Sequence, residues 1–400
     1  MNQLNDEIAE SISPPLEEEV FDALAGGAVR WRAREWRKNN GEVGTQEWQF
    51  YKTHGHDQII SLLHEVAKEV MLPGDIPFVV VRGKTGTVVR CNTPLGQRLL
   101  KIACADFFQV YLDYPLHHFS PVFRVFAQLR RAVPSSPSSL FDRLVPAEDA
   151  DSTVLQALRF VTALRRALGR KSIKTAHHNF RRGAKDNFNR FIDALDWLFQ
   201  RRKEVTVLRF DLHYREAGSQ PVKYGDKASF EGVDQFMGYR ERFHRSLDRR
   251  FCEALLGYAW ALEYGREAKW HLHYLVMLAP SDRHDDHSGL VHSLGEKWES
   301  LTERRGYIRN VNVSAKHRYS AVGRVRLDNP DVVMGLHFLV SYMTLAGLFV
   351  KLDAPERFIA FHTGRFPKKA LPQVGRPANR SSGSRLRITI EQAQALVKFI

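Results

Sequence analysis

The chain has 400 residues, 44% of them hydrophobic and 26% charged, so it is a globular protein with room for two domains. Its formal net charge of +14 favours a polyanionic partner, usually a nucleic acid. No apolar run reaches the roughly 18 residues of a membrane span, the polar first residues do not resemble a secretory signal, and three scattered cysteines build no disulfide framework. We therefore expect a cytoplasmic, nucleoid-associated protein with no membrane partner.

Residues 1–165 predict a mostly helical N-terminal region that contains one β-hairpin. Apolar residues recur with helical spacing from 48 to 70 and from 152 to 168. Residues 78–90 read as two short strands that turn at a pair of glycines. No named DNA-binding motif occurs in this region, so its role stays open.

A second domain is predicted at 166–355, followed by a basic C-terminal tail at 356–400. Residues 169–182 are rich in Lys, Arg and His and predict a linker near the domain boundary, with a helix following at 184–202. The tail is rich in Gly, Ser, Pro and basic residues. It therefore either binds phosphates non-specifically or is a solvated charged segment.

Within the second domain the predicted elements follow the order β-α-β-β-α-β. Their ranges are 205–214, 230–255, the two strands of a hairpin within 257–278, 289–305 and 307–313. This order is the split arrangement of a ferredoxin-like antiparallel sheet, so the predicted fold class is α+β with the helices on one face. An edge strand at 318–327 and a strongly apolar helix at 332–350 follow.

The predicted hairpin carries a candidate metal site. Residues i and i+2 of a strand share a face, so His271 and His273 point the same way. If the hairpin turns about residue 267, Glu263 lies opposite His271 on that face. Two imidazoles and a carboxylate suit Mg²⁺, Mn²⁺ or Zn²⁺. Such an ion would polarise a phosphoryl oxygen for attack by a nucleophile such as a tyrosine.

Asp211 occupies the polar side of the first strand, opposite the apolar side formed by Leu208, Phe210 and alternate residues. It is a candidate fourth metal ligand or a partner that orients a ligand. An ion pair with Arg209 is the alternative interpretation.

His271-Leu-His273 resembles the His-hydrophobic-His motif of HUH endonucleases, the rolling-circle replication initiators and relaxases. More narrowly, the chain is similar to the filamentous-phage-type (inovirus) replication proteins found in bacterial prophages. The segments that carry this resemblance are 207–214, 260–265, 271–274, 316–319 and 341–344, with Gly-Arg pairs at 364–365 and 375–376. It extends over residues 185–377.

This resemblance implies a five-stranded antiparallel sheet that carries the metal ligands and a catalytic tyrosine, Tyr342, on a later helix. It implies a metal-dependent, sequence-specific single-strand DNA endonuclease that initiates rolling-circle replication of a phage, plasmid or prophage element. The cofactor would be Mg²⁺ or Mn²⁺, held by His271, His273 and Glu263, with Asp211 as the additional candidate. The partners would be single-stranded or supercoiled origin DNA, a host helicase and a host polymerase.

The resemblance also implies DNA contacts and one departure from the family pattern. The candidate DNA-binding residues are Arg209, Lys316, Arg318, Arg365, Lys368, Lys369 and Arg376. The family usually has a lysine soon after its tyrosine, but Leu345 and Ala346 stand here. Three alternatives follow from this departure. Another cation takes the place of that lysine, or Tyr319 is the nucleophile, or the chain is a non-catalytic DNA-binding regulator that retains the HUH fold. An ordinary core tyrosine at Tyr342 remains an alternative.

Overall fold

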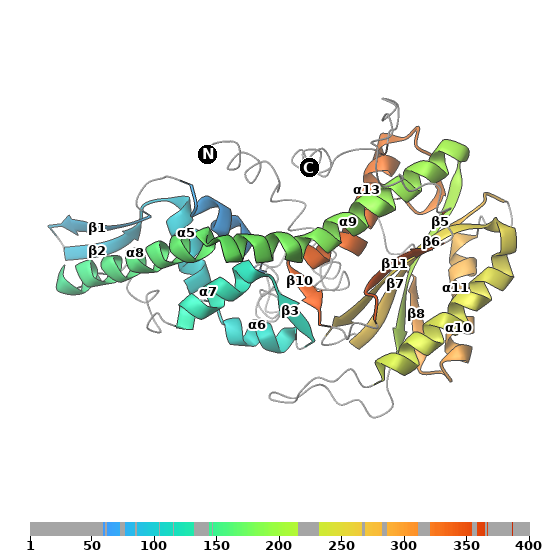
Figure 1. Cartoon of the computed structure of the whole chain (residues 1–400), viewed down its shortest axis with the longest axis horizontal. Helices are drawn as coiled ribbons and strands as arrows, with labels where there is room; N and C mark the ends of the chain where they lie inside the picture. Colours follow the sequence, from blue (N-terminus) through green and yellow to red (C-terminus); the bar gives the residue numbers. More distant parts are fainter. Residues whose placement is uncertain are drawn as a thin grey trace.

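The protein is an α+β structure of antiparallel sheets and helices (Figure 1). The computed structural model describes residues 59–60, 62–72, 77–84, 86–103, 105–114, 116–131, 144–145, 147–214, 232–265, 269–281, 286–310, 321–353, 358–364, 366 and 386. Within these ranges, no helix combines the length and the apolar character needed to cross a membrane.

The largest sheet contains the strands that were expected to carry the site. Its strands are β5 (Val205–Tyr214), β6 (Leu255–Gly265), β7 (Lys269–Leu278), β8 (Gly306–Asn310), β9 (Gly323–Val325) and β11 (Phe361–Gly364). The order is β11-β6-β7-β5-β8, with β9 also paired to β5, and every pairing is antiparallel. Helix α10 (Val233–Phe251) joins β5 to β6, and α11 (His287–Leu301) joins β7 to β8. The predicted β-α-β-β-α-β element order is confirmed.

The two helices of the predicted order, α10 and α11, pack on one face of this sheet as expected, and two further helices cover the other face. Helices α10 and α11 bury the face that carries Phe210 and Tyr274. The other face packs its small and aliphatic residues, including Ala259 and Met277, into a core shared with α9 (Lys171–Arg201) and α13 (Pro330–Thr344). Helix α13 (Pro330–Thr344) begins with Pro330 at its first turn, capped by the Asn329 side chain. It is shorter than predicted because a 3₁₀ turn at Leu345–Leu348 and strand β10 (Val350–Leu352) follow.

The N-terminal region has the predicted hairpin and several helices. The hairpin is β1 (Phe78–Gly83) with β2 (Gly86–Cys91), and β4 (Leu144–Val145) extends it. The helices are α5 (Pro94–Ala103), α6 (Phe107–Asp113), α7 (Pro121–Arg131) and α8 (Ala147–Gly169). Strand β3 (His117–Phe119) pairs with β10, and one apolar core contains residues from both parts of the chain. The two predicted domains therefore share a core.

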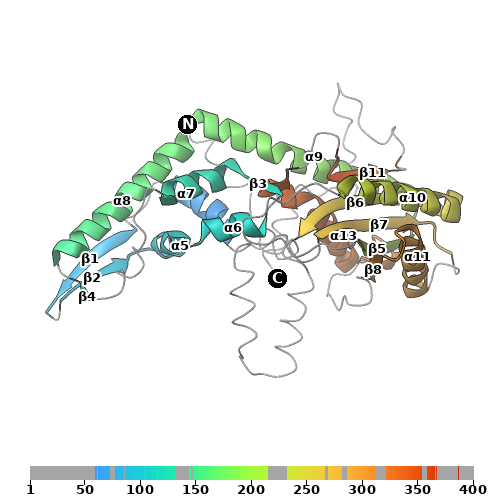
Figure 2. The same ribbon diagram turned by 90° about the horizontal axis from the view of Figure 1, so that it is seen from below.

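The segment predicted as a linker belongs to a long helix, α9 (Lys171–Arg201) (Figure 2). Arg170 has extended dihedral angles, so α8 and α9 are separate helices that meet at that residue. Phe180, Ala184 and Phe188 recur with helical spacing and give this basic stretch an apolar side. The many charges of the stretch predicted a linker, whereas its sparse apolar residues are enough to hold a helix against the core.

The predicted tail is not wholly separate from the sheet, because β11 (Phe361–Gly364) pairs with β6. Several predicted site residues lie outside the described residues. They are Lys316, Arg318, Tyr319, Arg365, Lys368, Lys369 and Arg376.

Candidate metal centre

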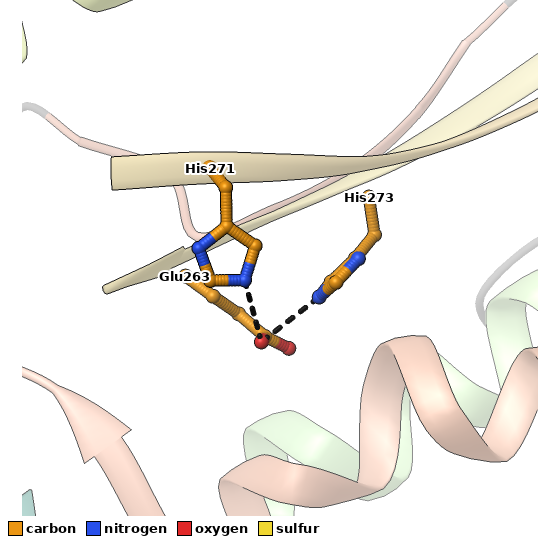
Figure 3. A group of neighbouring side chains, drawn as sticks. All are labelled: Glu263, His271 and His273. Carbon is orange, nitrogen blue, oxygen red and sulfur yellow. Dashed lines mark ion pairs between the residues drawn. The ribbon is translucent and has the colours of Figure 1, made fainter. Parts of the chain in front are cut away.

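The β6–β7 hairpin brings Glu263, His271 and His273 together on one face of the sheet (Figure 3). Its register pairs Glu263 with His271 and Ala261 with His273, as the predicted turn position required. Glu263 Oε2 lies 2.9 Å from Nε2 of His273 and 3.4 Å from Nε2 of His271. Ala261 leaves room beside the two rings, so the carboxylate reaches both.

The second nitrogen of each imidazole is held by the surrounding protein. His271 Nδ1 lies 3.0 Å from the Lys269 carbonyl oxygen, and His273 Nδ1 lies 2.6 Å from Oδ1 of Asp211. Each acceptor favours a proton on Nδ1 and leaves Nε2 facing Glu263. This carboxylate or carbonyl behind a ligating histidine is the usual support of a protein metal site.

These contacts change the assignments of Asp211 and Arg209. Asp211 lies behind His273 and outside the group that could hold an ion, so its position fits a residue that orients His273 better than a fourth ligand. Arg209 forms an ion pair with Asp211, lies 3.1 Å from Nδ1 of His273 and is only 4% exposed. It is therefore buried, which argues against a direct contact with DNA.

The buried charges of the site hold one another in their ionised forms. Burial opposes ionisation of Glu263, but the adjacent His273 and His271 outweigh it and hold the pKa of that carboxyl well below its usual range. Burial also lowers the pKa of His273, but Glu263 and Asp211 outweigh it and raise that pKa to about 9. The pKa of Asp211 is likewise lowered, because Arg209 and His273 overcome the effect of burial.

The three side chains offer donor atoms that could hold a divalent cation, and one such atom from each lies within 4.8 Å of the other two. Two ligands that each lie about 2.1 Å from an octahedral or tetrahedral ion are separated by about 3.0–3.4 Å. The Oε2 to Nε2 separations of 2.9 and 3.4 Å match this spacing. Imidazole with carboxylate is compatible with Mn²⁺ and Zn²⁺, and Mg²⁺ would depend more on water and substrate oxygens.

Tyr342 of α13 faces this group. Its hydroxyl oxygen lies 2.8 Å from Nε2 of His273, and the two rings meet edge-on with centroids 4.8 Å apart. Burial and the negative charge of Glu263 raise the pKa of Tyr342 well above its ordinary value, with Arg209 acting in the opposite direction. The sequence spacing of the helix alone did not determine which of its faces would meet the histidines.

Leu345 stands near Tyr342 where the resembled family usually has a lysine, and another cation lies near the tyrosine. Leu345 is 3% exposed and belongs to the apolar core, so a lysine there would be a buried charge. The guanidinium carbon of Arg209 lies instead 5.1 Å from the centroid of the Tyr342 ring. Arg209 is thus the cation that stands beside this tyrosine.

Two further residues of the same face were not predicted as site residues. The His213 ring lies nearly parallel to those of His271 and Tyr307, with centroids 5.2 and 4.7 Å away. Neither ring nitrogen of His213 has a hydrogen-bond partner among the residues that the structure describes, and burial with the adjacent His271 lowers its pKa to about 3. The alternation of Arg209, Asp211 and His213 along β5 was the available signal for this residue.

Comparison with family models, curated proteins and solved structures found no match to this chain. The site is therefore interpreted from its own geometry.

Proposed function

We propose that the chain is a metal-dependent, sequence-specific single-strand DNA endonuclease of the HUH type, which initiates rolling-circle replication of a phage, plasmid or prophage element. The observation that carries this proposal is the Tyr342 hydroxyl, 2.8 Å from Nε2 of a histidine in a group able to hold a divalent ion. The antiparallel order β6-β7-β5-β8, with its two connecting helices, supports a ferredoxin-like, HUH-type sheet.

In this proposal Glu263, His271 and His273 hold Mg²⁺ or Mn²⁺, which would withdraw charge from the scissile phosphate as a Lewis acid. The Tyr342 oxygen forms a bond to phosphorus while the bond from phosphorus to the 3′ oxygen breaks. The tyrosine gives up one proton and the departing 3′ oxygen gains one, so the step is balanced. The 5′ phosphate stays on the protein, and the free 3′-hydroxyl is left for a polymerase.

The residues around this centre have distinct roles in the proposal. Asp211 and the Lys269 carbonyl keep the two imidazoles in one orientation, which limits the cost of organising the site when DNA binds. Arg209 lies over the Tyr342 ring and favours negative charge on its oxygen.

The alternative function is a non-catalytic DNA-binding regulator. The specific observations that favour it are the buried Leu345, at a position near which the resembled family usually has lysine, and the raised pKa of Tyr342. Both reduce the readiness of the tyrosine to lose its proton.

The test is incubation of the full chain with supercoiled and single-stranded DNA libraries in Mn²⁺ or Mg²⁺, followed by denaturing gels that detect a protein–DNA adduct. Tyr342→Phe should abolish the adduct. Tyr307→Phe, a matched control on the same sheet face, should keep it. An adduct that survives in Tyr342→Phe and disappears in Tyr319→Phe would move the nucleophile. Tight binding without an adduct in either metal would favour the regulator.

A further inference from the structure

The first half of α9 presents a cationic face to solvent. Lys171, Lys174, His178 and Arg182 are exposed and recur with three- and four-residue spacing. They fall within about 80° of the helix circumference and extend over about 17 Å. The sequence has no Asp or Glu between residues 152 and 185, and the next acidic side chain is the exposed Asp186, one turn beyond Arg182.

The opposite side of this helix is occupied by protein contacts. Ala184 is 4% exposed and Phe188 is 1% exposed, both in the main core. The Phe180 ring meets His118 edge-on at 5.4 Å, and the Lys351 ammonium lies 4.4 Å from its centroid. The apolar side is therefore not free to enter a lipid bilayer, as an interfacial membrane helix would require.

The cationic face ends next to the element that carries the proposed nucleophile. The 3₁₀ turn that follows α13 packs on α9, and a Cβ placed on Gly347 would lie 3.4 Å from Cβ of Ala184. Arg182 is two residues before Ala184 along the same helix. The buried side of the helix that carries the cationic face therefore packs on the turn that follows the helix of Tyr342.

We infer that the exposed face of α9 formed by Lys171, Lys174, His178 and Arg182 binds the phosphate backbone of a DNA duplex. A single strand would gain from aromatic rings on which its bases stack. The one aromatic residue between 171 and 185 apart from histidine is Phe180, which faces inward. Cations without stacking rings fit phosphates of a duplex. The inference rests on the proposed function only for the choice of DNA over duplex RNA.

The test compares two charge-matched variants of the full chain, each carrying Tyr342→Phe. The first combines Lys171→Gln, Lys174→Gln and Arg182→Gln. The control combines Arg242→Gln, Arg245→Gln and Arg249→Gln, which removes exposed cations from α10 across the sheet. Fluorescence anisotropy with a labelled duplex of arbitrary sequence, in EDTA, measures binding between about 0.05 and 0.2 M salt.

The α9 variant should bind the duplex at least about tenfold more weakly than the control, with a salt-dependence slope reduced by about 2.7, or 0.9 for each lost phosphate contact. A charge-preserving set, Lys171→Arg, Lys174→Arg and Arg182→Lys, should restore binding. Equal loss in both variants, or no loss in the α9 variant, would overturn the inference. Selective loss of binding to vesicles rich in phosphatidylserine, with duplex binding kept, would overturn it in favour of a membrane surface. Because the metal and the tyrosine are absent from this test, a failure of nicking leaves it unaffected.

Discussion

The two faces of the large sheet are built from alternating residues of the same strands, and they are equally buried but chemically opposite. On one face, Phe210 lies parallel to Tyr274 with ring centroids 5.6 Å apart and meets Phe243 of α10 edge-on. On the other face, the neighbouring Arg209 and Asp211 form an ion pair and are 4% and 5% exposed. One residue along the strand therefore separates an apolar core from a cluster of buried charges.

This difference separates the face that stabilises the fold from the face on which the proposed function depends. The aromatic face stabilises the fold by removing apolar surface from water. Buried ion pairs contribute little or no net stability compared with apolar residues of similar volume, because each ion loses its hydration. A face that keeps His271 and His273 buried beside the partly exposed Glu263 gains little stability from these groups, and perturbed ionisable groups of this kind are frequent at active sites.

The largest expected effect is on the aromatic face. Phe210→Ala should lower the free energy of unfolding by about 4 kcal/mol, since it opens a cavity between Tyr274 and Phe243. Urea unfolding measures the change. Calorimetric titration with Mn²⁺ of the folded variant should give an unchanged affinity, and a large loss of affinity would contradict the separation of the two faces.

On the polar face, Asp211→Ala should cost about 3 kcal/mol of unfolding free energy, because it leaves the buried Arg209 without its carboxylate. Arg209→Met combined with Asp211→Leu should recover most of this loss while the adduct yield stays low. If the single variant unfolds like the wild type in urea, the ion pair is not buried in solution.

The helix that covers the polar face supplies a pH-dependent test. Burial lowers the pKa of His337 in α13 to about 4, so the unfolded chain binds a proton between about pH 6.5 and 4 that the folded chain does not. Its contribution to stability should be complete above pH 6.5 and should fall by at most about 1.4 kcal/mol per pH unit below it. Thermal unfolding should show that the stability of His337→Leu falls less steeply than that of the wild type below pH 6.5. An identical pH dependence in the two proteins would mean that the His337 ring is solvated.

The smallest expected effect on stability belongs to Glu263. Glu263→Gln keeps the shape and one hydrogen-bond acceptor beside His273, so we expect a loss of about 1 kcal/mol. Mn²⁺ affinity should fall at least about tenfold, because the loss of a residue that only supports a metal ligand already lowers metal affinity by about that factor. Asp186→Asn, an exposed acidic residue of α9, serves as the charge-matched control. Unchanged affinity in Glu263→Gln would remove Glu263 from the metal centre.

The sequence by itself determined the features that depend on neighbours along the chain. Strand alternation put His271 and His273 on one side, and the short turn of the hairpin put Glu263 opposite them. The β-α-β-β-α-β order followed from the same local periodicities. The basic stretch 169–182 was predicted as a linker but belongs largely to helix α9. Its few apolar residues recur with a period of about 3.6, and this weak pattern is hard to recognise among so many charges.

Only the tertiary structure decided the features that depend on packing between distant segments. Strand pairing put Asp211 behind His273 and made Arg209 a buried partner of that carboxylate, because both belong to β5, beside β7. The packing of α13 on the polar face brought Tyr342 to His273, across 69 residues of chain. Side-chain orientation on a helix is set by what the helix packs against, and local sequence does not contain that information.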